Sequence, residues 1–250
     1  DRLTIKELKD VFEYTADNLS KGQLSYEDVN PYMYLKERVT GLAEQHYIKQ
    51  VVIDEAQDYS LVQYKVIEHA FRRAQITLLA DVNQSIMPFV NYDDFDGVLS
   101  TLQGGRARIK TETQYLTKTY RSTVEINDFA SSIISGSNSL VKARLDRHGD
   151  EVLITKDDET GARSKMVKDA LELKKKYNTV AIIYKTEREC REFLKQISRL
   201  PESKNFIFMM DGENNFSADR VMVMPVYIAK GLEFDAVLVP SANENNYNAK

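Results

Sequence analysis

The chain has 250 residues, a formal net charge of −4 and one cysteine, Cys190. Its 42% hydrophobic and 29% charged residues are typical of a globular protein with one large or two small domains. These values exclude a disulfide scaffold, a collagen-like chain and a nucleic-acid binder of overall basic charge, although a local basic groove remains open. No apolar run reaches the roughly 20 residues of a membrane-spanning helix. We expect a cytoplasmic protein without membrane contact, and a monomer.

The predicted elements begin with helices and then alternate. Helical periodicity runs through the first forty residues, where Ser25 and Asp28 predict a capping box ahead of a helix over 32–39. Farther along, amphipathic spacing predicts helices over 61–73, 94–102, 124–134, 164–177 and 187–200.

Short apolar runs lie between these helices. They predict strands over 47–53, 76–80, 108–116, 152–155, 180–184, 206–209, 221–224 and 236–239. Alternating strands and helices indicate an α/β fold, in which helices cover a parallel sheet. The simplest division is an incomplete α/β unit up to about residue 120 and a more complete one after it.

Two acids follow the first predicted strand, in the string Val-Val-Ile-Asp-Glu-Ala-Gln-Asp that contains Asp54 and Glu55. The carboxyl edge of a parallel sheet is where α/β folds bind ligands. In nucleotide hydrolysis one acid holds Mg²⁺ and its neighbour can orient or deprotonate water. A bare acidic pair is more often a solvated turn, but the whole string is far more specific.

Polar residues also follow the next strand and a later junction. Gln84 lies in Ala-Asp-Val-Asn-Gln-Ser-Ile, where its amide can contact a terminal phosphate. Arg121 lies in Lys-Thr-Tyr-Arg-Ser, where it can stabilise charge on a transferred phosphoryl group, and Tyr120 can stack on a base. Each fragment by itself is more often a turn or a helix cap.

A fourth motif, Ala-Lys-Gly-Leu-Glu-Phe-Asp, enters the strand predicted at 236–239. Gly231 permits a tight turn or close backbone approach. Lys230 and Glu233 flank it as candidate phosphate and ribose contacts. A Lys-Gly turn before a strand is otherwise unremarkable.

The order and spacing of the four motifs closely resemble the second to fifth nucleotide-site motifs of superfamily-one helicases of the UvrD/Rep type, over residues 48–240. The string Asp-Glu-Ala-Gln-Asp-Tyr-Ser looks most like the HelD (helicase IV-like) branch. The resemblance implies a RecA-like (P-loop NTPase) parallel sheet, with one complete unit plus part of another. It implies a helical insertion or connection at 1–45, the distal part of a first RecA-like domain at 46–120 and a second RecA-like helicase domain at 121–250.

The resemblance also implies a role for each motif residue in a motor that closes two such domains around ATP. Asp54 would ligate Mg²⁺, Glu55 would activate water, and Gln84 would sense the γ-phosphate. Arg121 would contact that phosphate from the domain interface.

The remaining motif residues would hold the nucleotide. Tyr120 would stack on the adenine and Glu233 would reach the ribose. Lys230 and Gly231 would lie near the phosphates or the nucleic acid path.

The phosphate loop of such motors is missing from these residues. A Walker loop needs Gly-x-x-x-x-Gly-Lys-Ser/Thr, whose backbone N–H groups cradle phosphates. In this sequence no glycine is directly followed by a lysine. The chain also starts without Met, so we expect a piece of a longer protein. We predict that the 250 residues alone neither hydrolyse ATP nor bind it tightly.

Other features of the sequence say less about what the protein binds. Residues 161–200 carry eleven basic and five acidic side chains, which could bind phosphates but more often form solvated helix faces. Phe206 and Phe208 are expected in the core, and the three scattered histidines form no metal cluster. Met87-Pro88-Phe89 replaces the aromatic and Arg with which UvrD-like enzymes touch single-stranded DNA.

Three functions therefore stay open. The first is an ATP-driven DNA helicase or translocase that moves on single-stranded DNA. The second is a HelD-type motor that remodels or recycles RNA polymerase, and the third is a non-catalytic module with a helicase fold. Intact Asp54, Glu55, Gln84 and Arg121 argue against the third, because a decayed site has no need of all four.

Overall fold

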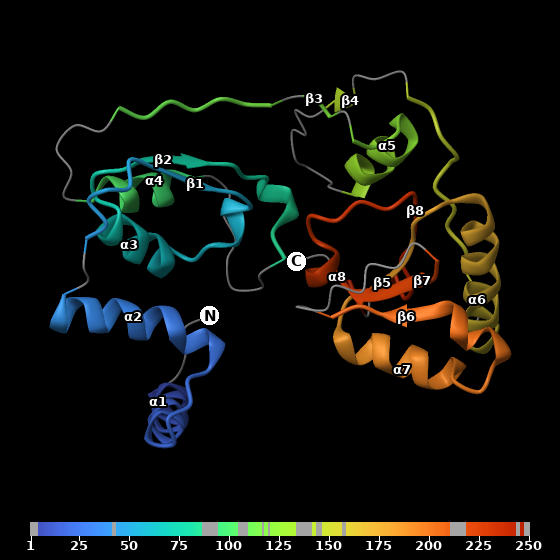
Figure 1. The fold of residues 1–250 in the computed structure, drawn as a ribbon, viewed down its shortest axis with the longest axis horizontal. Coiled ribbons are helices and arrows are strands. Elements are labelled where there is room, and N and C mark those ends of the chain that lie inside the picture. Colours follow the sequence, from blue (N-terminus) through green and yellow to red (C-terminus); the bar gives the residue numbers. More distant parts are fainter. Residues whose placement is uncertain are drawn as a thin grey trace. The chain divides into compact units, whose positions relative to one another are not determined.

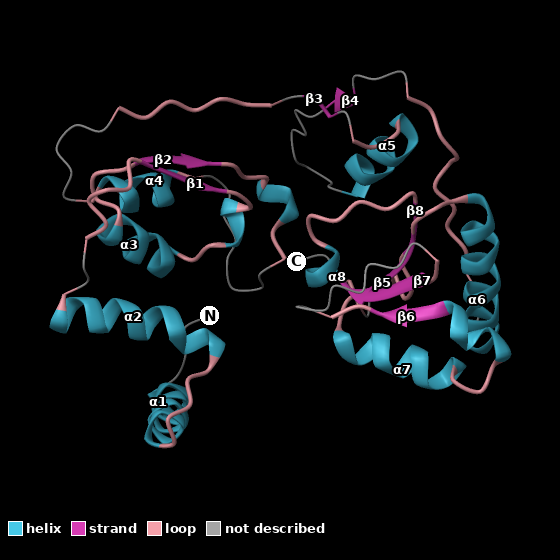
Figure 2. Ribbon diagram, viewed as in Figure 1, coloured by secondary structure: helices cyan, strands magenta, loops and turns pink. Residues whose placement is uncertain are grey.

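The computed structural model divides the chain into two compact units, residues 1–150 (unit 1) and 151–250 (unit 2). Both contain parallel strands with flanking helices, so the predicted α/β class is confirmed (Figures 1 and 2). The structure describes residues 5–41, 44–86, 95–104, 110–116, 118–119, 121–133, 142–143, 147–156, 159–210, 219–243 and 246–247. The boundary between the two compact units, at residue 150, differs from the division at residue 120 that the motifs suggest. The domain bounds inferred from the motifs stay a prediction.

Unit 1 is built around a parallel pair of short strands. Its elements are α1 (Ile5–Ser20), α2 (Tyr26–Thr40), β1 (Gln50–Ile53), α3 (Leu61–Ala70), β2 (Gln75–Leu78), α4 (Asp96–Gln103), β3 (Lys118–Thr119), α5 (Val124–Ile133) and β4 (Lys142–Ala143). Strands β1 and β2 pair with Ile53 opposite Leu78. Ile53 packs in an apolar core with Tyr64 of α3 and Val98 of α4. Helix α3 starts at a capping box, in which Ser60 and Gln63 satisfy each other's backbone N–H groups.

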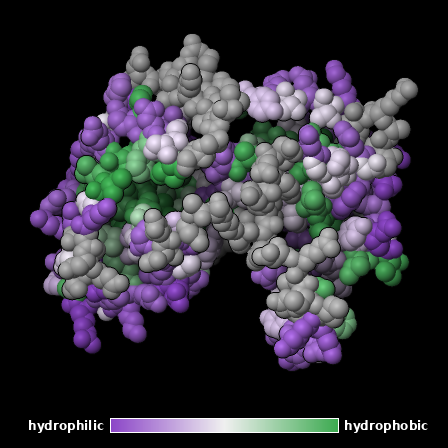
Figure 3. All heavy atoms as spheres, turned by 180° about the vertical axis from the view of Figure 1, so that it is seen from behind, coloured by the Kyte–Doolittle hydropathy of each residue, from purple (hydrophilic) through white to green (hydrophobic). Residues whose placement is uncertain are grey.

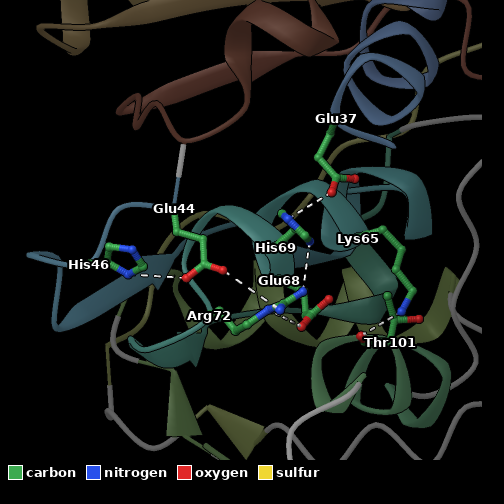
Figure 4. A network of polar contacts seen from close by, with 8 residues as sticks. All are labelled: Glu37, Glu44, His46, Lys65, Glu68, His69, Arg72 and Thr101. Carbon is green, nitrogen blue, oxygen red and sulfur yellow. Dashed lines mark hydrogen bonds and ion pairs between the residues drawn. The ribbon is translucent and has the colours of Figure 1, made fainter. Parts of the chain in front are cut away.

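Polar contacts join α2, α3 and α4 (Figure 4). His69 lies between the buried carboxylate of Glu37 on α2, 2.9 Å from Nε2, and the guanidinium of Arg72, 3.0 Å from Nδ1. A guanidinium can only donate, so Nδ1 accepts and the opposite ring nitrogen, Nε2, donates to Glu37. Lys65 Nζ donates to the Thr101 carbonyl of α4 at 3.3 Å. Unit 1 therefore adds polar pairs to the small apolar core that its two-stranded sheet β1-β2 supplies.

Unit 2 holds a four-stranded parallel sheet in the order β6-β7-β5-β8. Its elements are α6 (Glu159–Lys176), β5 (Val180–Tyr184), α7 (Glu187–Ile197), β6 (Phe206–Phe208), β7 (Val221–Pro225), α8 (Val226–Ala229) and β8 (Ala236–Leu238). One face packs on α6 and α7 through Ile182 and Val223. The other face packs Met222 and Met224 against residues of α8 and the segment that follows it. Burial on both faces is typical of parallel sheets and explains the continuous apolar runs in these strands.

Two predicted strands are wrong within the described residues. Residues 110–116 and 152–155 pair with no strand there, and Leu116 and Leu153 are 86% and 84% exposed. An apolar run becomes a strand only where a neighbouring strand offers its backbone groups and a face to pack on.

The predicted capping box near the N-terminus is also wrong, and α2 starts at Tyr26. Ser25 is the N-cap residue, but its side chain makes no capping hydrogen bond. Its Oγ accepts from Asn18 at 3.3 Å, while the Asp28 carboxylate accepts from Thr15 Oγ1 at 3.0 Å. Both side chains are thus used to connect α1 with α2.

Apolar side chains reach the surface in several areas (Figure 3). They include Leu8, Val11 and Phe12 of α1, which are 54%, 54% and 71% exposed. Among the described residues, no helix combines the length and apolar character that crossing a bilayer requires.

Candidate nucleotide-hydrolysis site

The carboxyl ends of β1 and β2 bring the first two motifs together. Beyond the paired strands, Leu79 N donates to the Ile53 carbonyl and Ala56 N donates to the Leu79 carbonyl, both at 2.9 Å. This continuation holds residues 54–58 beside residues 80–84. Parallel pairing therefore places the acids of one motif and the amides of the other at one sheet edge, where α/β folds bind ligands.

Asp54 and Glu55 form a constrained turn directly after β1. Glu55 has a left-handed backbone, with φ at 50°, and its N–H donates to Asp54 Oδ1 at 2.9 Å. Left-handed conformations cost free energy in residues other than glycine, and they persist where the surrounding contacts hold them. Asp54 is exposed and Glu55 is half-buried. Asp54 can thus meet a hydrated cation while Glu55 keeps a defined orientation.

The second motif forms a 3₁₀ turn over Val82–Gln84. Asp81 caps this turn, since its Oδ1 accepts from Asn83 N at 3.0 Å. Its Oδ2 accepts from Gln84 Nε2 at 2.7 Å. The side chain of Gln84 is exposed, so a ligand at the sheet edge can reach it.

Gln57 joins the two motifs, and the sequence assigned it no role. It is 1% exposed on the 3₁₀ turn Ala56–Asp58. Its Nε2 donates to Glu55 Oε2 at 2.7 Å, and its Oε1 accepts from Asp81 N at 3.1 Å. In the sequence, the signal for this role was an uncharged polar residue, Gln57, in the short segment where the apolar strand is followed by acidic residues. Only the fold shows that this amide is buried between two loops.

Arg121 lies in a separate part of unit 1, just before α5, and is exposed. Arg147 donates to its carbonyl at 3.2 Å, while Glu125 accepts from His148 Nδ1 at 2.7 Å and from Gly149 N at 2.9 Å. The hydrogen bond from His148 is the main reason why the pKa of Glu125 falls to about 2. These contacts fix the backbone that carries Arg121.

The fourth motif belongs to unit 2. Lys230 follows α8, and Gly231 has a φ of +79°, as its predicted turn requires. Asp235 holds the far side of this loop, because its carboxylate accepts from Thr179 N and Oγ1 at 2.8 and 2.9 Å. The two hydrogen bonds from Thr179 lower the pKa of Asp235.

The predicted site residues are therefore divided. Asp54, Glu55 and Gln84 lie at one sheet edge of unit 1, and Arg121 lies elsewhere in that unit. Lys230, Gly231 and Glu233 lie in unit 2, while Tyr120 and the segment 87–89 fall outside the described residues. Their roles stay predictions.

The basic stretch over 161–200 forms the exposed sides of α6 and α7. Some of its charges have partners on the same helix, such as Arg191 with Glu187 at 2.6 Å and Arg188 with Glu192 at 3.8 Å. Lys174 Nζ donates to two backbone carbonyls. These pairs favour solvated helix faces over a phosphate-binding groove.

Three unit 2 side chains lie in or against its core, as the sequence predicts for Phe206 and Phe208. Phe206 is buried, and Phe208 packs against the same cluster with the Arg191 guanidinium 4.8 Å from its ring centre. Cys190 is fully buried, and burial raises its pKa to about 12, so this thiol is unreactive.

The described residues contain no group of three or more His, Cys, Asp or Glu side chains placed to hold a metal ion. Mg²⁺ is usually held by one or two carboxylates together with substrate phosphates and water, so a magnesium site at Asp54 does not need such a group. Asp54 fits this role as an exposed carboxylate at the edge of the sheet.

Residues 9–93 match the family model of the UvrD/REP helicase N-terminal domain. This match supports the resemblance to a UvrD/Rep-type helicase. It includes most of α1 and all of α2 together with the first two motifs, and it ends before the other two. No curated protein matches the chain.

Proposed function

We propose that the chain is the part of a superfamily-one, ATP-dependent DNA helicase or translocase that activates water for hydrolysis. The proposal is supported chiefly by the sheet edge of unit 1, where Asp54 and Glu55 lie beside the turn that carries Gln84. The family match over these motifs gives a second, independent support.

The chain's own residues would divide the work as follows. Glu55, oriented by the Gln57 amide, would accept the proton of the attacking water. Asp54 would hold Mg²⁺, which supplies charge neutralisation on the phosphates when bound. Gln84 would contact the terminal phosphate, and Arg121 would stabilise the charge that develops on it. Tyr120, Lys230, Gly231 and Glu233 would hold the nucleotide.

A Walker loop must come from outside these 250 residues, because none of their glycines is directly followed by a lysine. The direct test is ATP turnover by the full-length protein that carries this chain, with Mg²⁺ and with or without single-stranded DNA. We expect DNA-stimulated turnover, and a Glu55→Gln variant with kcat lower by roughly 10²- to 10⁴-fold.

Glu27→Gln is the matched control, because Glu27 is exposed in the first turn of α2. It should leave turnover unchanged. Turnover that Glu55→Gln leaves intact would contradict the proposal, as would measurable ATPase activity of residues 1–250 alone.

A second candidate is a HelD-type motor that remodels RNA polymerase. It is favoured by the string Asp-Glu-Ala-Gln-Asp-Tyr-Ser and by Met-Pro-Phe in place of the DNA-contacting aromatic and Arg. Co-purification with RNA polymerase, together with ATPase activity that single-stranded DNA does not stimulate, would select this candidate. Strong DNA stimulation without polymerase binding would reject it.

A further inference from the structure

We propose that Gln57 is a positioning residue for hydrolysis, whose buried amide holds the Glu55 carboxylate and couples it to the loop that carries Gln84. The inference rests on the proposed function, because Gln57 positions a water-activating group only if Glu55 is one. It names a residue and a physical link that the motif roles do not contain.

The amide of Gln57 is held in a single orientation. Its nitrogen donates to Glu55 Oε2 at 2.7 Å and its oxygen accepts from Asp81 N at 3.1 Å. Turning the amide by 180° would face its oxygen to a carboxylate and its NH₂ group to an N–H, and both contacts would become repulsive. Because the side chain is 1% exposed, water cannot replace either partner without opening the turn.

Both contacts lead to groups at the sheet edge. Glu55 has a left-handed backbone that surrounding contacts must hold, and its carboxylate accepts from the Gln57 amide. On the other side, Asp81 accepts from Gln84 Nε2 at 2.7 Å. A continuous path of hydrogen bonds therefore runs from Glu55 through Gln57 and Asp81 to Gln84.

This path connects two events that hydrolysis must coordinate. A ligand that binds the Gln84 amide competes with Asp81, to which that amide donates a hydrogen bond. It therefore acts on Asp81, whose backbone N–H donates to the Gln57 side chain. Gln57 in turn sets the position of the Glu55 carboxylate. A general base displaced by about 1 Å can cost 10²-fold in rate. Gln57 is thus expected to affect kcat rather than ATP binding.

The test compares variants of the full-length protein by steady-state turnover of Mg²⁺–ATP. Gln57→Met keeps a similar length in an unbranched side chain but removes both hydrogen bonds. We expect kcat to fall by about 10-fold or more with KM for ATP changed less than about 2-fold, the signature of an interaction made in the transition state. Gln75→Met is the matched control, since it makes the same substitution at an exposed glutamine of β2.

A second variant separates positioning from packing and also serves if Gln57→Met does not fold. Gln57→Glu keeps an acceptor for Asp81 N but sets a like charge against Glu55, and protonation of the introduced carboxyl restores a donor. We expect low activity at neutral pH and partial recovery as the pH falls, whereas the parent protein shows no such recovery.

The outcomes distinguish this inference from the proposed function. If Glu55→Gln abolishes turnover while Gln57→Met behaves like Gln75→Met, the positioning role is wrong and the hydrolytic function stands. An unshifted pH profile for Gln57→Glu would overturn the positioning role in the same way. If the parent protein does not hydrolyse ATP at all, both are wrong.

Discussion

Unit 1 holds its sheet edge with polar contacts, whereas unit 2 buries a parallel sheet on both faces. In β7 all five residues are buried, whereas in β1 only Ile53 is. The turns after β1 and β2 depend instead on Gln57, Asp81 and the hydroxyl of Tyr64. Apolar burial is spread over many atoms, but each polar contact in unit 1 rests on one donor and one acceptor.

This difference has a consequence for function. A single substitution in unit 2 should lower the stability of that unit, because a cavity in a two-sided core cannot close easily. A single substitution at the edge of β1 and β2 should move a side chain without unfolding the unit. Positions that tune chemistry are thus expected in unit 1 and positions that set stability in unit 2.

Ile182→Ala tests the apolar side of this comparison and should have the largest effect. Ile182 is fully buried in β5, and its truncation should destabilise unit 2 by about 2–5 kcal/mol. Hydrogen exchange should speed up in β5 and β7 and stay unchanged in β1 and β2. Ile154→Ala, at a residue 72% exposed in the same unit, should change stability by less than about 0.5 kcal/mol. Equal effects of the two changes would contradict a two-sided core.

Gly149→Ala tests the contacts that hold the backbone at Arg121. A Cβ atom at Gly149 would lie 2.8 Å from Thr123 Cγ2, so one of the segments must shift, at a cost of about 1–3 kcal/mol. Amide exchange at Gly149 and Val124 should accelerate. Gly97→Ala is the control, because nothing lies within 4 Å of a Cβ there and alanine favours helix α4. If the amides of Gly149 and Val124 still exchange slowly in Gly149→Ala, the 147–149 segment does not hold the backbone at Arg121.

Tyr64→Phe tests whether a single polar contact holds the turn after β1. The fully buried hydroxyl donates to the Ala56 carbonyl at 2.5 Å, and its loss should cost about 1 kcal/mol. Amide exchange at Tyr59, whose N–H donates to the Ala56 carbonyl, should quicken while α3 stays protected. Tyr47→Phe, at a residue 75% exposed, should have no measurable effect. An intact turn in Tyr64→Phe would mean that the remaining hydrogen bonds, among them those of Gln57, are enough to hold it.

The contact between Glu125 and His148 should depend on pH. The pKa of Glu125 lies at about 2, below its ordinary 4.5, so the carboxylate stabilises the folded state fully above about pH 4.5. That contribution should be lost as the pH falls from 4.5 towards 2. An NMR titration of the Glu125 carboxyl measures it, and Glu125→Gln should remove the pH dependence. A titration midpoint near 4.5 would show that the pair does not form.

Surface ion pairs on α7 should contribute least to the stability of the folded protein. Arg188→Gln removes an exposed pair with Glu192 and should cost about 0.3–0.5 kcal/mol or less. Arg191→Gln should cost slightly more, because its guanidinium also lies over the Phe208 ring. Thermal melts of the two variants make the comparison. A large loss of affinity for single-stranded DNA in either variant would show that this helix face binds phosphates instead.

Apolar patterning predicted the four-stranded sheet of unit 2 closely, but it failed once in each unit. The strands at 180–184, 206–209, 221–224 and 236–239 appear within one or two residues of their expected bounds. Strands β5 and β7 are buried on both faces, which requires unbroken apolar runs. The same reasoning failed at 110–116 and 152–155, since pairing depends on a neighbour that periodicity cannot show. Ser25 and Asp28 failed for a similar reason, because residues of α1 bind their side chains.

The sequence by itself determined the α/β class, the position of Asp54 and Glu55 at a strand end, and the turn at Gly231. Local rules decide these features: apolar runs make buried strands, and glycine adopts a positive φ at little cost. Only the tertiary structure decided that Gln57 is buried between two loops and that the 147–149 segment holds the backbone of Arg121. Those contacts join residues distant in the chain, and a hydrogen bond over 24 or 26 residues leaves no periodic trace in the sequence.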